Sequence, residues 1–337
     1  MLKTWLRKAL QAAGYDLVRR RRADARYRQA SHSAAMSLPE GAEQDLRADH
    51  PRLLELRRIY AQSPLPMAAR GMWGEDYLAR ELDLRYFRGD NAYVWQFRNV
   101  GAQARLKYYL LLRDIAARDP HGWLQLAEED GAFGCWSFDY PGWPRVSRDL
   151  LDSINELLYL DARMGLAGIE ALRIVDIGAG YGRLAHRAHA LLPGLVEYVC
   201  VDGVPESTFL AEYYLRHRGC EQARVLDIGQ LPDYAPAAAP QLAVNIHSFS
   251  EMRLESIRGW LAWLVALGTQ HLLVVPNDAQ QMLSMEPDGT RQDFAPLFAE
   301  AGFTLTDTRP VHEDPTLREL VNVSDHYFFY RRGAAAA

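Results

Sequence analysis

The 337-residue sequence has few cysteines, no long apolar run and a shortage of basic residues over most of its length. The three cysteines, Cys135, Cys200 and Cys220, form neither a C-x-x-C pair nor an even disulfide framework. This usage favours a reducing compartment and argues against a structural zinc site. No apolar run approaches the length of a membrane span. The start lacks the apolar core and cleavage site of a signal peptide, so we expect a cytoplasmic protein.

Basic residues are concentrated at the start of the chain. Of 38 Lys/Arg and 43 Asp/Glu, nine basic and two acidic residues lie in residues 1–30, which leaves a net charge of −12 for the rest. A nucleic-acid-binding protein needs a broad basic surface, so we expect no nucleic acid partner. Apolar residues recur at helical spacing from Leu2 to Leu17, which predicts a basic amphipathic helix within residues 1–30. Such a helix either contacts the inner face of an anionic membrane or packs on the body or a partner.

The remaining sequence divides into segments that differ in composition and in hydrophobic pattern. Residues 31–50 are small and polar and predict a linker. Residues 51–146 are helical in pattern and rich in aromatics, including Tyr93, Trp95 and Phe97, which are either core or part of an acceptor cap. Residues 147–332 form the main predicted domain, in which Ser147 is the expected N-cap of a first helix. Residues 333–337 are interpreted as a tail.

Short β-type runs alternate with helical stretches after residue 171. The seven runs are 172–178, 196–203, 223–228, 241–248, 271–277, 303–309 and 325–332. Helical stretches separate the first six runs, and none is evident between the last two. This alternation predicts an α/β fold with a mostly parallel, doubly wound sheet, closed at one edge by an antiparallel hairpin.

A glycine-rich turn follows the first run, in "RIVDIGAGYGRLAHR" (173–187). The dinucleotide fingerprint G-x-G-x-x-G would place glycine at position 183, where this chain has Arg183. Asp176 stands two residues before Gly178, and a carboxylate there repels a pyrophosphate but suits a cationic ligand. S-adenosylmethionine (SAM) carries a sulfonium, an ammonium and a carboxylate that helix-start N–H groups can bind. The expected SAM-binding residues of this turn are Asp176, Gly178, Ala179, Gly180 and Gly182.

Two more acids end the next two strands. Asp202, followed by Gly203, is placed to accept the ribose hydroxyls of an adenosine ligand. Asp227 is placed to accept the adenine amino group, with Ile228 packing on the ring. Asn245, on the fourth run, completes the expected cofactor set. The competing interpretations are a dinucleotide oxidoreductase and a turn that merely connects a strand to a helix.

Four segments together resemble a known family: "VSRDLLDS", "VDIGAGYGRLAHR", "VCVDGVPESTFLAEYYL" and "NIHSFSEM". They are similar to the sugar O-methyltransferases of bacterial surface-polysaccharide gene clusters, which belong to the class I SAM-dependent methyltransferases. The resemblance covers about residues 90–330. It implies a Rossmann-like, seven-stranded sheet and an acceptor that is a sugar hydroxyl of a surface glycan or its precursor. A non-sugar acceptor, such as a natural-product phenol or amine, and a non-catalytic scaffold are the alternatives.

The segment "NIHSFSEM" is expected beside the reacting methyl group, at the end of the fourth strand. His247 is the first candidate for the general base, because an imidazole titrates near neutral pH. Glu251 is a second candidate base, or orients His247 or the acceptor. The expected acceptor-binding residues are Arg148, Asp152, Ser248 and Asn277. Mg²⁺ bound at strand ends is an alternative that we do not expect, because no dense carboxylate cluster is present.

Overall fold

The computed structural model describes residues 37–69, 71–89, 102–277 and 279–333. The predicted basic helix (1–30), the aromatics Tyr93, Trp95 and Phe97, and residues 334–337 of the predicted tail lie outside these ranges. Within the described part of the chain, no helix has the length and apolar character needed to cross a membrane.

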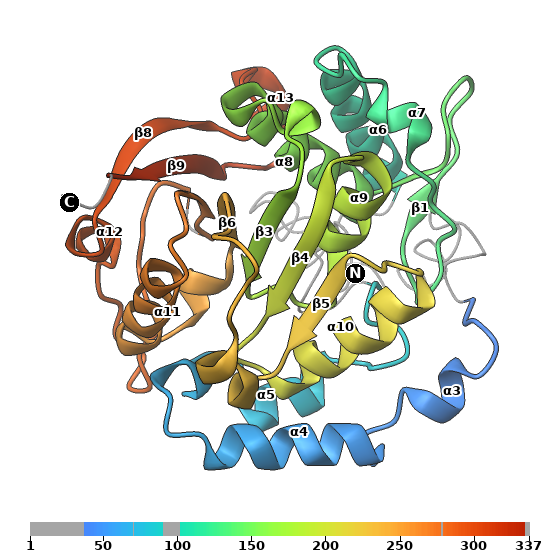
Figure 1. Cartoon of the computed structure of the whole chain (residues 1–337). Helices are drawn as coiled ribbons and strands as arrows, with labels where there is room; N and C mark the ends of the chain where they lie inside the picture. The colour runs from blue at the N-terminus through green and yellow to red at the C-terminus, as the bar shows by residue number, and fades with distance from the viewer. Residues whose placement is uncertain (1–36, 70, 90–101, 278, 334–337) are drawn as a thin grey trace, which may run out of the picture.

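Seven strands form one sheet in the order β5-β4-β3-β6-β7-β9-β8 (Figure 1). The strands are β3 (Leu172–Ile177), β4 (Leu195–Val201), β5 (Ala223–Leu226), β6 (Leu242–Ile246), β7 (His271–Val275), β8 (Phe303–Pro310) and β9 (His326–Arg332). The pairs among β3 to β7 are parallel, whereas β9 is antiparallel to both β7 and β8. The expected α/β fold with a seven-stranded, mostly parallel sheet and an antiparallel edge hairpin is confirmed.

Two details of the connections differ from expectation. A helix, α13 (Pro315–Val321), lies between β8 and β9, where we expected none. It is only seven residues long and buries Leu317 and Val321, one pair at helical spacing, so its periodicity is too short to stand out. Between β5 and β6 the chain forms the 3₁₀ helix η4 (Ile228–Asp233) instead of an α-helix. Pro232, inside η4, has no N–H to donate to a longer helical ladder.

The other helices surround this sheet. They are α3 (Ala42–Asp45), α4 (Pro51–Gln62), α5 (Glu75–Glu81), α6 (Ala102–Ala116), α7 (Trp123–Leu126), α8 (Arg148–Met164), α9 (Arg183–Leu191), α10 (Pro205–His217), α11 (Leu254–Ala266) and α12 (Ala295–Glu300), with the 3₁₀ helices η2 (Pro66–Ala68), η3 (Leu166–Gly168) and η5 (Ser248–Glu251). A small second sheet pairs β1 (Ser137–Phe138) with β2 (Val146–Ser147). α4 lies at the edge where the parallel strands end and packs on α10 (Figure 1).

The helical residues before α8 share one apolar core with the sheet. Leu53 of α4 and Tyr108 of α6 are fully buried in the same cluster as Val175 of β3. Ala42 and Leu46, within the stretch that the sequence marks as a linker, also belong to this cluster and are 0% and 2% exposed. The segment before α8 therefore contributes directly to the core and can form walls of a site at the sheet.

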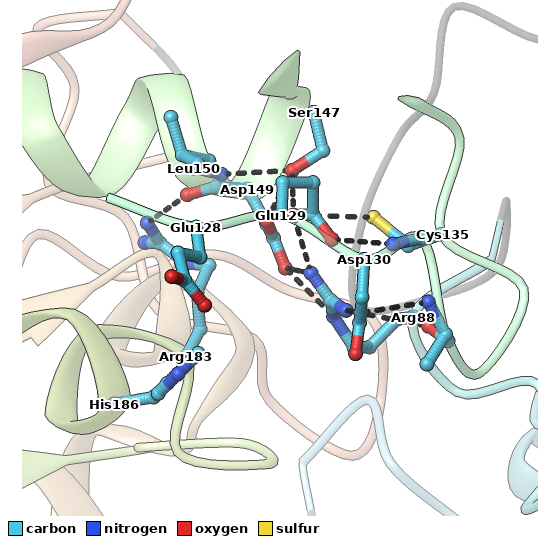
Figure 2. A network of polar contacts seen from close by, with 12 residues as sticks. Arg88, Glu128, Glu129, Asp130, Cys135, Ser147, Asp149, Leu150, Arg183 and His186 are labelled. Atoms are coloured by element: carbon cyan, nitrogen blue, oxygen red, sulfur yellow. Dashed lines mark hydrogen bonds and ion pairs between the residues drawn. The ribbon is translucent and has the colours of Figure 1, made fainter. Parts of the chain in front are cut away.

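A buried ionic network fixes the start of α8 (Figure 2). Ser147 caps this helix, as expected, because its Oγ accepts a hydrogen bond from the Leu150 N–H. Arg88 donates to Asp149 from Nε (3.0 Å) and Nη2 (2.8 Å) and to Glu129 from Nη2 (2.7 Å). Burial alone would raise the pKa of Asp149, but Arg88 and Arg187 outweigh it and hold that pKa well below its usual range.

Removing Arg88 should therefore leave two buried carboxylates without their main partner. We expect Arg88→Ala to lower the free energy of unfolding by about 3–5 kcal/mol, measured by urea denaturation. The matched control is Arg85→Ala, since Arg85 is half exposed and pairs with exposed Asp83. The control should change stability by less than about 0.5 kcal/mol. Equal effects of the two substitutions would contradict a structural role for the network.

Candidate functional site

The turn between β3 and α9 has a backbone that requires glycine. Gly178, Gly180 and Gly182 have φ values of 74°, 58° and 83°, all in the left-handed region that side chains disfavour. A Cβ on Gly178 would also collide with the Ser248 side chain, at the end of β6. The turn is thus shaped both by its own conformation and by the close approach of the neighbouring strand end.

A cavity of about 770 Å³ lies at the carboxyl ends of the parallel strands. Six of the expected cofactor residues line it: Asp176, Gly178, Ala179, Gly180, Asp202 and Gly203. Both candidate catalytic residues and the four expected acceptor residues line it as well: His247, Glu251, Arg148, Asp152, Ser248 and Asn277. Its volume lies within the usual range of small-molecule sites, about 300–1,000 Å³.

Four residues of the expected cofactor set lie outside the cavity lining. Gly182 is the N-cap of α9, and Ile228 is 1% exposed in the core. Asp227 caps η4 through the Gly229 N–H and lies 3.2 Å from the Arg52 guanidinium. Asn245 is fully buried, and its Nδ2 donates to the Ile177 carbonyl at 2.9 Å. The side chains of Asp227 and Asn245 therefore bond to groups of the protein near the strand ends.

The two strand-end acids in the cavity are bound by groups of the fold. Asp202 accepts the Gly180 N–H at 3.0 Å and the Val204 N–H at 2.9 Å, so it links the glycine turn to the end of β4. Asp176 accepts the Tyr198 hydroxyl at 2.9 Å. Burial raises the pKa of each carboxyl to about 7. Both acids can therefore change charge near neutral pH when a ligand brings hydroxyl donors or positive charge.

His247 follows β6 with a positive φ, at φ 68° and ψ −35°. Its Nε2 lies 3.5 Å from Oδ2 of Asp325, in the loop between α13 and β9. Burial would lower the pKa of His247, but the hydrogen bond and charge of Asp325 raise it on balance. Asp325 is not among the residues predicted from the sequence, because nothing in the local pattern shows that the residue before β9 reaches the end of β6.

Glu251 has partners other than His247. Its carboxylate accepts the Trp73 Nε1–H at 2.7 Å and the Asn277 Nδ2–H at 2.8 Å. Its carbonyl accepts the Met72 N–H at 3.0 Å, and Gly71 packs directly on that carbonyl. Glu251 therefore fastens the segment before α5 to the end of β6. Its suggested role in orienting His247 stays a prediction, and Asp325 is the nearer acid.

Other lining residues of the cavity are charged or aromatic. Arg148 pairs with Asp152 through two bonds from Nε, at 2.8 and 2.7 Å. Lys107 of α6 also lines the cavity, and its burial and the positive charge of Arg148 lower its pKa. Trp73 and Tyr77 supply an aromatic wall, with their rings edge-to-face at 5.5 Å. The sequence did not single out Lys107, Trp73 or Tyr77. Aromatic residues at such spacing usually belong to the core, and charged residues on a helix usually belong to the solvated surface.

Metal-ligating side chains gather elsewhere in the described chain. Within those residues, the one close group of such atoms is Glu129, Cys135 and Asp149. This group belongs to the buried network, where Arg88 and Arg187 already bind the two carboxylates. Two guanidinium groups in hydrogen-bond contact with these carboxylates oppose the binding of a cation.

Comparison with known proteins gives distant structural matches. No protein-family model and no curated protein matches the sequence. Among solved structures, the [4+2]-cyclase SpnF has a TM-score of 0.39 and 15% identity, over 69% of this chain and 96% of that chain. A SAM-dependent methyltransferase from Aquifex aeolicus has 0.38 and 14%, over 51% and 87%. Magnesium protoporphyrin IX methyltransferase from Synechocystis, with bound SAM, has 0.37 and 13%, over 57% and 87%. Matches this distant assign no family and no activity to the chain, so its function is argued from the site.

Proposed function

We propose that the protein is a SAM-dependent methyltransferase whose acceptor is a sugar hydroxyl of a bacterial surface glycan or its precursor. The observation that carries this proposal is one cavity that joins the glycine turn and Asp202 to His247 and Asp325. The first pair of features suits an adenosine ligand, and the second pair suits removal of a proton. The membrane contact of residues 1–30 rests on the sequence alone, and the acceptor class rests on the sequence resemblance together with the polar groups of the cavity.

The residues of the turn fit SAM better than a dinucleotide. Asp176 lies at the end of the strand that leads into the turn, so a pyrophosphate held there would bring negative charge against its carboxyl. SAM brings a sulfonium instead, and its ribose hydroxyls can donate to Asp202 at the end of β4. The left-handed glycines let a ligand approach the backbone closely. Bound SAM would supply an electrophilic methyl group on a cationic sulfur.

His247 can make the acceptor nucleophilic. A sugar hydroxyl is a poor nucleophile until a base takes its proton, and neutral imidazole is suited to that step. The Asp325 carboxylate stabilises the imidazolium that forms and orients the ring through Nε2. The walls of the cavity hold the two reactants together and exclude water, which supplies the rest of the rate enhancement.

Several polar groups that line the cavity fit a polyhydroxylated acceptor better than a flat phenol. Asp152, Ser248 and Asn277 present carboxylate, hydroxyl and amide groups that can bind several hydroxyls. Trp73 adds an aromatic face against which the apolar side of a sugar ring can pack. Turnover on sugars, phenols and amines, compared at equal concentration, would separate these acceptor classes. A non-catalytic scaffold would show turnover on none of them.

We expect SAM and S-adenosylhomocysteine, but not NAD, to bind in the micromolar range by calorimetry. Asp202→Ala should weaken both ligands about 10- to 100-fold, because it removes a carboxylate that accepts ribose hydroxyls. Asp233→Ala, at an exposed position of η4, is the control and should bind both ligands normally. Tighter binding of NAD than of SAM would contradict the proposal.

His247→Ala should reduce methyl transfer about 10²- to 10⁴-fold and leave the affinity for S-adenosylhomocysteine within a few-fold. Since the neutral ring is the base, the wild-type rate should rise with pH through an apparent pKa above the ordinary histidine value of about 6.5. Asp325→Asn removes the group that raises this pKa, so the profile should move to lower pH. His121→Ala is the control, because His121 pairs with Asp161 outside the cavity. Near-normal turnover of His247→Ala would exclude His247 as the base.

A further inference from the structure

One carboxylate oxygen in the cavity wall is buried without a hydrogen bond. Glu156 of α8 is 7% exposed, and its Oε1 accepts Nη2 of Arg183 at 2.8 Å. Its Oε2 accepts no hydrogen bond from any residue that the structure describes. Leaving a buried charged acceptor unpaired costs free energy, so such atoms usually have a ligand or another partner.

Glu156 and Arg183 lie near both the glycine turn and His247. Both line the cavity, and Arg183 is the first residue of α9, directly after Gly182. Glu156 lies within electrostatic range of both Asp176 and His247. A ligand that binds the turn and directs its reacting atom toward His247 can therefore contact this ion pair.

Together the two side chains present an anion and a cation side by side. Arg183 donates from Nη1 to Ser153 Oγ at 2.8 Å and from Nη2 to Glu156. A guanidinium has five N–H donors, so others remain for a ligand carboxylate. A free α-amino acid group carries an ammonium and a carboxylate on one carbon, which is the charge pattern complementary to this pair.

We propose that Glu156 and Arg183 form the receptor for the amino-acid end of SAM, with Glu156 Oε2 accepting from the ammonium and Arg183 donating to the carboxylate. This inference rests on the proposed function. It also gives a reason for the arginine at the position where a dinucleotide fingerprint has glycine. Burial raises the pKa of Glu156 despite Arg183, and a bound ammonium would favour its charged form.

The receptor can be tested with the unmodified full chain by changing the ligand. Calorimetry would compare S-adenosylhomocysteine with its N-acetyl derivative, its methyl ester and 5′-methylthioadenosine, which lacks the amino-acid end. Each blocked derivative should bind about 10- to 100-fold more weakly, because a charge-assisted hydrogen bond is lost. 5′-Methylthioadenosine should be the weakest of the four.

Two substitutions should then remove these preferences separately. In Glu156→Gln, the penalty for N-acetylation should fall to about threefold or less while the penalty for the methyl ester persists; in Arg183→Gln, the reverse should hold. Glu197→Gln is the matched control, because Glu197 pairs with Arg173 outside the cavity at 3.7 Å. It should keep both penalties. Thermal unfolding of each variant shows whether it is folded. If a variant is not folded, the comparison of the four ligands on the wild type still tests the receptor.

The outcomes separate this inference from the proposed function. If the wild type binds S-adenosylhomocysteine and its blocked derivatives equally well, the receptor is wrong and SAM binding stands. If both variants lose both penalties equally, separate roles for the two side chains are also wrong. If the wild type binds none of the four adenosine compounds, the proposed function itself fails.

Discussion

The buried Asp149 carboxylate is the point on which the site depends. Oδ2 accepts from Arg88 and from the Tyr181 hydroxyl of the glycine turn, and Oδ1 accepts from Ser147 at the start of α8. One side chain therefore ties together the segment before α6, the first helix of the main domain and the ligand turn. The Asp149 side chain is only 2% exposed, so water cannot replace these partners. If one of the three elements were not in place, the carboxylate would be buried without that partner, and we therefore expect the three to fold together.

The cavity above this network is assembled from segments that are distant in sequence. The turn after β3 and the end of β4 supply the cofactor half, and the end of β6 supplies His247. The loop before β9 supplies Asp325, and residues near α5 supply Trp73, which Glu251 holds in place. The helical region before α8 thus both forms a wall of the site and shares a single core with the sheet.

Local patterns predict the sheet well because each strand is an apolar run bounded by turn residues. The glycine spacing likewise identifies a turn that the backbone angles show to require glycine. Local patterns fail where a side chain depends on a distant partner. Asp325 reaches His247 only because β9 inserts between β7 and β8. Arg52 forms its ion pair with Asp227 only because α4 packs on α10. Glu156 reads as an ordinary helix residue until its burial beside Arg183 is known.

The most direct test of the account is a crystal structure of the full chain with S-adenosylhomocysteine. We predict that the ribose hydroxyls lie within hydrogen-bond distance of Asp202, that the sulfur faces the region of His247, and that the glycine turn surrounds the ligand. A ligand bound outside the cavity, or one whose sulfur points away from the end of β6, would contradict the account.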